Sequence, residues 1–216
     1  MIPSQTWIAA CSRMMTNHFL FPRYRRYDCG MNRKNTQHTA VSPILVGLMG
    51  SGKSSIGRRL AKHMGLPLID LDDYIVERAG RSIPEIFEQD GEPAFRQMET
   101  DALRAVVGQH AVIATGGGIV GSAENRRILK AHPPVIWLKA SPEFLAGRID
   151  GDSNRPLIAA GDTLKKLQQL AAIRYPLYEQ CADFILPRGD MKKPEALKAI
   201  IQFLSGSQNR TTNQHE

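Results

Sequence analysis

The sequence contains few cysteines and no long apolar run. Only three of its 216 residues are cysteine (Cys11, Cys29 and Cys181), and no two of them form a C-x-x-C pair. A fold stapled by disulfides is therefore excluded, and the pattern is typical of a reducing compartment, so we expect a cytoplasmic protein. No stretch approaches the roughly 18 consecutive apolar residues of a membrane span, so no membrane partner is expected. The composition, 42% hydrophobic and 23% charged, is that of a soluble globular domain.

An excess of positive charge is confined to the start of the chain. Residues 1–40 carry six basic side chains and one acidic one, whereas the rest of the chain carries 22 basic and 20 acidic side chains. Because the folded body is nearly balanced, we expect no nucleic-acid partner. The leader has no apolar core of a secretory signal and too few serines for a typical transit peptide. We predict that residues 1–41 form a disordered leader, or that translation starts at Met31.

From residue 42 onward, short apolar runs alternate with helical segments. This alternation predicts a parallel sheet covered by helices on both faces. Residues 42–206 are expected to form this domain, with a loop at 149–161 and a polar tail at 207–216. Strands are predicted at 44–46, 66–69, 111–114, 135–138 and 182–186, and helices at 53–64, 74–79, 83–87, 93–107, 124–131, 141–148, 162–178 and 194–204.

The most specific local motif is the run GLMGSGKS at 47–54, which fits G-x-x-x-x-G-K-[ST] between a strand and a helix. Glycines in such a loop let the backbone bring successive amides close to phosphate oxygens. The helix that begins near Lys53 adds its free N–H groups and its positive dipole end. Lys53 can reach the β- and γ-phosphates, and the Ser54 hydroxyl can bind Mg²⁺. The motif therefore predicts a site for a nucleoside triphosphate.

The reaction has to be inferred from other residues. The sequence has no N-K-x-D guanine motif and no apolar strand that ends in Asp-Glu, which argues against a GTPase and a motor ATPase. Asp70 and Asp72 follow the second predicted strand, and ligands gather at the carboxyl ends of parallel strands. One carboxylate there can hold Mg²⁺, and another can orient a hydroxyl and accept its proton. Asp73 is better explained as a turn or capping residue.

Taken together and in order, the motifs resemble those of the shikimate kinase family over nearly all of residues 44–204. The matching runs are GLMGSGKS at 47–54, Asp70-x-Asp72, GRSIPEIF at 80–87, GEPAFR at 91–96 with Glu99, TGGG at 115–118, NRPL at 154–157 and RYPLY at 174–178. The resemblance implies a three-layer α/β/α P-loop kinase fold with a five-stranded parallel sheet and a mobile lid. It also implies that ATP phosphorylates the 3-hydroxyl of shikimate, a step of aromatic amino-acid (chorismate) biosynthesis.

The resemblance assigns roles to individual residues. Asp72 would bind the hydroxyls of shikimate and act as the base, while Lys53 and the lid residue Arg155 would act on the transferring phosphate. Guanidinium groups suit a planar carboxylate, and bare glycines allow the backbone to approach the ring. The implied shikimate ligands are Asp72, Arg96, Gly117, Gly118 and Arg174, and the implied Mg²⁺ ligands are Ser54 and Asp70. The implied ATP ligands are Gly50, Ser51, Gly52, Lys53, Ser54, Ser55, Arg148 and Arg155.

Some of these residues also have simpler explanations. Arg96 lies four residues after Glu92, the spacing of a solvated ion pair on a helix, and Arg174 could be an ordinary surface charge. The residues that line the adenine near 188–191 stay unassigned. A gluconate-type metabolite kinase would share the phosphate loop, and so would a non-catalytic nucleotide-sensing module. We favour the shikimate kinase, acting as a monomer because no spare apolar stripe is evident.

Overall fold

The computed structural model describes residues 41–149, 163–189 and 191–212. The predicted leader, except Val41, and almost all of the predicted lid, including Arg155, lie outside the described residues. Within the described part, no helix is both long and apolar enough to cross a bilayer.

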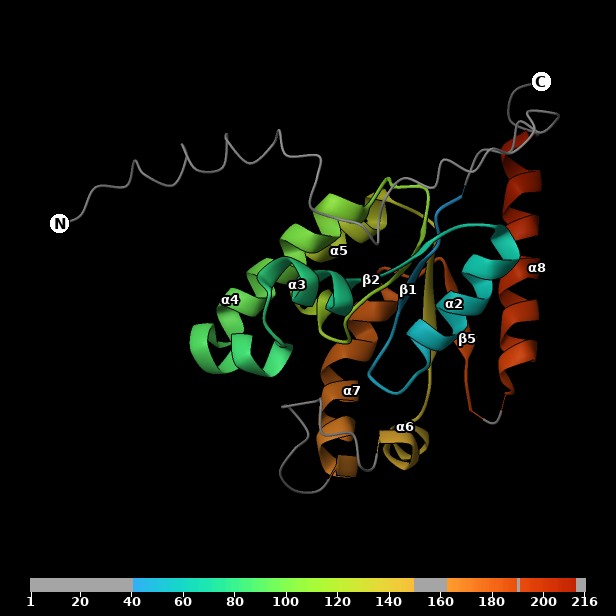
Figure 1. Ribbon diagram of the computed structural model, residues 1–216. Helices are drawn as coiled ribbons and strands as arrows, with labels where there is room; N and C mark the ends of the chain where they lie inside the picture. Colours follow the sequence, from blue (N-terminus) through green and yellow to red (C-terminus); the bar gives the residue numbers. More distant parts are fainter. Residues whose placement is uncertain (1–40, 150–162, 190, 213–216) are drawn as a thin grey trace, which may run out of the picture. The chain divides into compact units, whose positions relative to one another are not determined.

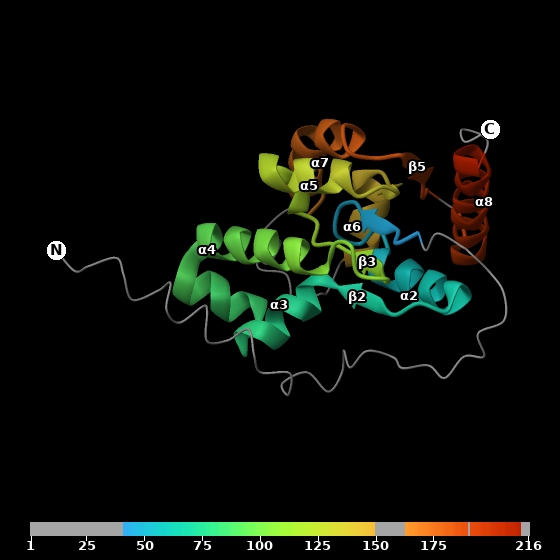
Figure 2. The same ribbon diagram turned by 90° about the horizontal axis from the view of Figure 1, so that it is seen from above.

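The described chain forms a five-stranded parallel sheet in the order β2-β3-β1-β4-β5 (Figures 1 and 2). The strands are β1 (Ile44–Val46), β2 (Leu68–Asp70), β3 (Val112–Ala114), β4 (Val135–Lys139) and β5 (Phe184–Pro187). The helices are α2 (Lys53–Met64), α3 (Leu71–Ala79), α4 (Ile83–Val106), η2 (Ile119–Gly121), α5 (Ala123–Ala131), α6 (Pro142–Ile149), α7 (Thr163–Glu179) and α8 (Lys193–Thr212). The predicted α/β fold is confirmed.

Helices cover both faces of the sheet because its central strands are apolar on both sides. One face packs against α2 and α8; its buried core includes Leu45, Ile136, Ile56 and Ile200. On the other face, Trp137 of β4 stacks on Tyr178 of α7. Figure 2 shows α2 and α8 on one side of the strands and α5 and α7 on the other. This is the three-layer arrangement expected for strands with continuous apolar runs.

The strand register brings three strand ends to one edge of the sheet. Asp70 at the end of β2 pairs with Ala114, and Ala114 also marks the end of β3. Ala114 in turn pairs with Leu45 of β1, two residues before Gly47. Three segments therefore begin at the same edge of the sheet: the acidic segment after β2, the glycine run at 116–118 after β3, and the phosphate loop at 47–54 after β1.

Local differences from the predicted elements have identifiable causes. Helix α3 begins at Leu71 and not at Tyr74, because Asp70 is its N-cap and accepts a hydrogen bond from the backbone N–H of Asp72 at 3.1 Å. The predicted capping box at Ser82 and Glu85 is confirmed. The predicted break between two helices appears as a kink at Gly91, whose φ is 80°. Helix α8 continues beyond the predicted end at 204, and the short η2 was not predicted.

Candidate active site

The phosphate loop, residues 47–54, connects β1 to α2. Gly47, Gly50 and Gly52 all have positive φ, a conformation that glycine adopts at little cost. Lys53 is buried, and its Nζ donates hydrogen bonds to the carbonyls of Gly47 at 2.8 Å and Leu48 at 3.1 Å. The lysine therefore folds back over its own loop, where its charge faces the region that the loop encloses.

The first turn of α2 carries the other predicted phosphate and metal ligands. Ser54 is exposed and Ser55 is half-buried, and the helix begins without a side-chain cap. Its first N–H groups and its dipole are thus oriented to favour an anion at the loop.

Asp72, on the first turn of α3, lies beside a second carboxylate. A Cβ added to Gly116 would lie 2.9 Å from Oδ1 of Asp72 and 2.6 Å from Oε1 of Glu99. Both carboxylates therefore approach a backbone position that only glycine can fill. Glu99 is 2% exposed, and burial raises the pKa of its carboxyl; the charge of Arg96 opposes this shift and that of Asp72 adds to it.

The glycine run after β3 links the acidic residues to the phosphate loop. Gly117 packs on that loop, since a Cβ there would lie 3.2 Å from the backbone N of Met49. The next residue, Gly118, lies against Arg96, because its Cβ would come within 2.7 Å of the Arg96 Cζ. Three consecutive glycines therefore contact three different parts of the site.

Arg96 of α4 is held between two glutamates. Its Nε and Nη2 donate to Oε1 of Glu92 at 3.1 and 2.8 Å, and its Nη1 donates to Oε2 of Glu99 at 2.5 Å. The helix ion pair with Glu92 considered for this position is thus present, but the buried pair with Glu99 fixes the guanidinium beside the glycine run as well. Arg96 is only partly exposed.

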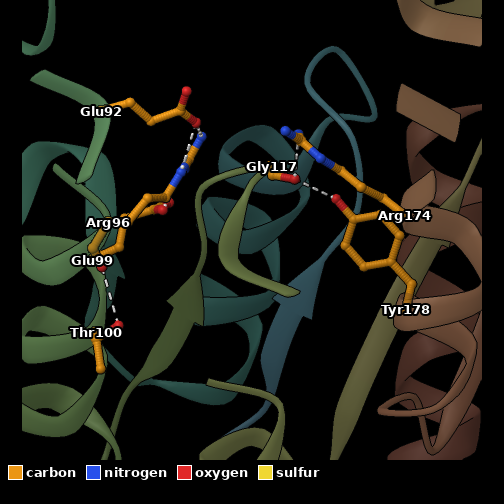
Figure 3. A network of polar contacts seen from close by, with 7 residues as sticks. All are labelled: Glu92, Arg96, Glu99, Thr100, Gly117, Arg174 and Tyr178. Atoms are coloured by element: carbon orange, nitrogen blue, oxygen red, sulfur yellow. Dashed lines mark hydrogen bonds and ion pairs between the residues drawn. The ribbon is translucent and has the colours of Figure 1, made fainter. Parts of the chain in front are cut away.

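Arg174 of α7 approaches the glycine run from the opposite side. Its Nη1 donates to the carbonyl oxygen of Gly117 at 3.0 Å, and the Tyr178 hydroxyl donates to the same oxygen at 2.6 Å. In Figure 3 the two arginines lie on opposite sides of Gly117: the Arg96 guanidinium of α4 contacts Glu92, and the Arg174 guanidinium of α7 reaches the Gly117 carbonyl. Burial lowers the pKa of Arg174, and the nearby charge of Arg96 lowers it further. Arg174 is therefore not an ordinary surface charge.

Two further arginines lie close to each other, and one of them, Arg148, is beside the phosphate loop. The Arg148 guanidinium lies 3.8 Å from where a Cβ on Gly52 would be, and over the ring of Phe144. Arg188, which the sequence left unassigned, is 2% exposed and donates from Nη1 to the carbonyl of Met191 at 3.0 Å. Burial lowers the pKa of Arg188, and Arg148 adds to this effect. The two positive charges are thus close together.

The structure brings together most of the residues singled out from the sequence. Lys53, Asp72, Arg96, Gly117, Gly118 and Arg174 lie around one edge of the sheet, and Arg155 falls outside the described residues. Glu99 and Tyr178 belong to the matching runs but received no role. The spacing of Glu99 and Tyr178 could have indicated that they lie beside the two arginines on their helices. Glu99 follows Arg96 by three residues and Tyr178 follows Arg174 by four, and residues at these spacings share a helix face.

A family model described as shikimate kinase matches residues 49–205. The chain belongs to the shikimate kinase family. Shikimate kinases of Caulobacter vibrioides and Enterococcus faecalis are 44% and 42% identical to this family member, each over 76% of its length. The matches cover 82% and 98% of those two relatives. The predicted family is therefore confirmed, and the chain is a kinase.

Solved structures agree with this assignment. The shikimate kinase from Acinetobacter baumannii in complex with shikimate matches with a TM-score of 0.72 and 35% identity, over 82% of this shikimate kinase family member and 97% of that chain. A gluconokinase from Sinorhizobium meliloti 1021 matches with a TM-score of 0.55 and 17% identity, over 82% and 98% of the two chains. The second likeness shows a shared fold alone.

Proposed function

We propose that this kinase transfers the γ-phosphoryl group of ATP to the 3-hydroxyl of shikimate, giving shikimate 3-phosphate and ADP. The observation that carries the proposal is the glycine run: Gly116 lies beside Asp72, Gly117 packs on the phosphate loop, and Gly118 lies against Arg96. An acceptor held at these glycines would have a carboxylate base, a phosphate cradle and a guanidinium group within reach.

ATP would lie with its phosphates in the loop at 47–54. The supporting features are the positive-φ glycines, the buried Lys53 and the start of α2. Gly50, Ser51, Gly52, Ser54 and Ser55 would surround the phosphates with amide and hydroxyl donors. Arg148 lies near Gly52, with Arg188 close to it, and these two arginines would lie near the nucleotide. Arg155 would add a further positive charge.

Mg²⁺ fits the oxygen donors at this edge of the sheet. Asp70 ends β2 in register with Ala114, and Ser54 exposes its hydroxyl at the first turn of α2. Carboxylate, hydroxyl, water and phosphate oxygens are the ligands that Mg²⁺ prefers. When bound there with ATP, the ion would neutralise charge on the β- and γ-phosphates.

Shikimate would be oriented by groups of opposite charge at its two ends. Arg96 and Arg174 lie on either side of Gly117 and Gly118, where they would bind the carboxylate of shikimate, and bidentate guanidinium contacts favour a planar carboxylate. Asp72 would accept hydrogen bonds from the ring hydroxyls at the other end. The fixed arginines reduce the ordering that binding requires.

The transfer itself would need positioning and charge neutralisation more than a strong base. The 3-hydroxyl oxygen forms a bond to the γ-phosphorus while the bond from that phosphorus to the β–γ bridging oxygen breaks. The hydroxyl proton passes to Asp72, and the electron pair of the broken bond leaves with ADP. Lys53 would stabilise the negative charge that develops on the phosphate oxygens.

The test is ADP release by the full chain with ATP, Mg²⁺ and one acceptor at a time: shikimate, quinate or gluconate. We expect turnover with shikimate that exceeds turnover with the other two by a wide margin. Preferred turnover of gluconate would favour a gluconate-type kinase, and ATP binding without turnover of any acceptor would favour a nucleotide-sensing module. We further propose that the enzyme acts as a cytoplasmic monomer, which light scattering can test for the oligomeric state.

A further inference from the structure

The carbonyl oxygen of Gly117 accepts two hydrogen bonds from α7. Tyr178 donates its hydroxyl at 2.6 Å and Arg174 donates Nη1 at 3.0 Å (Figure 3). A carbonyl oxygen has two lone pairs, so these donors can satisfy both. Arg174 is partly exposed, whereas Tyr178 is completely buried.

Tyr178 is a rigid donor. Its side chain is completely buried, and its ring stacks on Trp137 with centroids 5.5 Å apart and an interplanar angle of 26°. Burial raises the pKa of Tyr178 above its ordinary value, so the hydroxyl keeps its proton and remains a donor. The position of this hydroxyl is therefore fixed by the sheet and by α7.

The glycine run needs such an anchor because glycine is conformationally permissive. Residues 116–118 have no Cβ to restrict their backbone, and glycine peptides reorient more easily than others. The same absence of Cβ atoms is what lets Asp72, Met49 and Arg96 approach the run. Hydrogen bonds from α7 to the Gly117 carbonyl would restrict this backbone, which the glycines themselves cannot do because they have no side chains.

We propose that Tyr178 is a positioning residue for the shikimate site: its hydroxyl locks the peptide between Gly117 and Gly118. This inference rests on the proposed function. Because a peptide is planar and trans, the N–H of Gly118 points opposite to the Gly117 carbonyl, and so away from α7. Fixing the carbonyl thus aims a backbone donor toward the side where Arg96 lies, and it anchors Arg174 on the other side.

The test compares Tyr178→Phe with Tyr175→Phe in the full chain. Tyr175 is a matched control, because it lies on the same helix, contacts the same Trp137 ring, and donates its hydroxyl to the carbonyl of Ala140 instead. In Tyr178→Phe we expect the KM for shikimate to rise about three- to tenfold, the effect of one hydrogen bond. The KM for ATP should stay unchanged, and in Tyr175→Phe both constants should stay unchanged.

A second readout follows the backbone directly. The amide NMR signal of Gly118 should shift or broaden in Tyr178→Phe and stay as in the wild type in Tyr175→Phe. The inference is overturned if both variants leave the KM for shikimate and this signal unchanged. It is also overturned if Tyr178→Phe raises the KM values for ATP and shikimate equally, because that result indicates a purely structural role.

The kinetics of Arg174→Ala distinguish a failure of the proposed function from a failure of this inference. Arg174→Ala should raise the KM for shikimate by more than Tyr178→Phe does, because Arg174 is proposed to touch the substrate. If Arg174→Ala has no effect, shikimate does not bind here, and the proposed site and this inference both fall. If Arg174→Ala weakens binding while Tyr178→Phe matches its control, only the inference falls.

Discussion

Replacing Gly118 by alanine adds one methyl group against Arg96. The backbone of Gly118 has φ −95° and ψ −7°, a conformation that alanine adopts without strain. The new Cβ would lie 2.7 Å from Cζ of Arg96, whereas ordinary contacts begin at 3.4 Å. The guanidinium group must therefore move by roughly 1 Å, a displacement that can cost about a hundredfold when it misplaces a binding group.

The size of the effect follows from the contacts of Arg96. The group that must move is held by Glu99 at 2.5 Å and by Glu92 at 2.8 Å. Moving it strains these contacts and would spoil the proposed alignment of Arg96 with the carboxylate of shikimate. Hydrogen bonds to charged groups contribute about 1.5–3 kcal/mol each, so losing one would weaken shikimate binding roughly ten- to a hundredfold.

The assay is steady-state kinetics of Gly118→Ala against Gly121→Ala. Gly121 is a suitable control, because a Cβ there would meet nothing within 4 Å. We expect Gly118→Ala to raise the KM for shikimate roughly ten- to a hundredfold with little change in the KM for ATP, and Gly121→Ala to behave as the wild type. An unchanged KM for shikimate in Gly118→Ala would refute the placement of the substrate beside Arg96.

The remaining predictions concern charge and chain length. Lys53→Ala should lower kcat by roughly a hundredfold or more in the ADP-release assay; near-normal turnover would contradict its place at the phosphates. Arg174→Ala should raise the KM for shikimate roughly tenfold or more and spare ATP affinity, measured by calorimetry; a loss of ATP affinity would contradict the pocket. Burial raises the pKa of the Glu99 carboxyl above its ordinary value, so the folded state binds this proton more tightly than the unfolded chain does. The resulting stability is fully present below the unfolded pKa and is lost as pH rises through the folded pKa. Glu99→Gln should therefore flatten the stability–pH profile in that window, measured by thermal unfolding; an unaltered profile would contradict the buried carboxyl. A chain that starts at Met31 should keep full turnover, and reduced turnover would give the leader a role.

Much of the fold could be predicted because its signals are local. The strands of the sheet are short apolar runs, and the helices that follow them begin or end at recognisable residues such as Ser82 and Gly65. The phosphate loop is one continuous motif, so its glycines and Lys53 could be named without knowledge of tertiary structure. Alternation of strands and helices then predicts the parallel sheet.

Other features depend on contacts between distant segments. The burial of Glu99 and its closeness to Asp72 require α4, α3 and the glycine run to meet, which no local pattern reveals. Tyr178 and Gly117 are far apart in the sequence, and their hydrogen bond depends on how α7 packs against the sheet. The early start of α3 arose because the Asp70 carboxylate caps the helix, whereas capping was expected of Asp73.

The most direct measurement of the central claim changes the substrate instead of the enzyme. The full chain would be assayed with ATP and either shikimate or its carboxamide, which has the same ring and hydroxyls but no negative charge. We predict that kcat/KM falls at least about a hundredfold for the carboxamide, because two guanidinium groups lose their ionic partner. Equal kcat/KM values for the two acceptors would contradict a carboxylate site between Arg96 and Arg174.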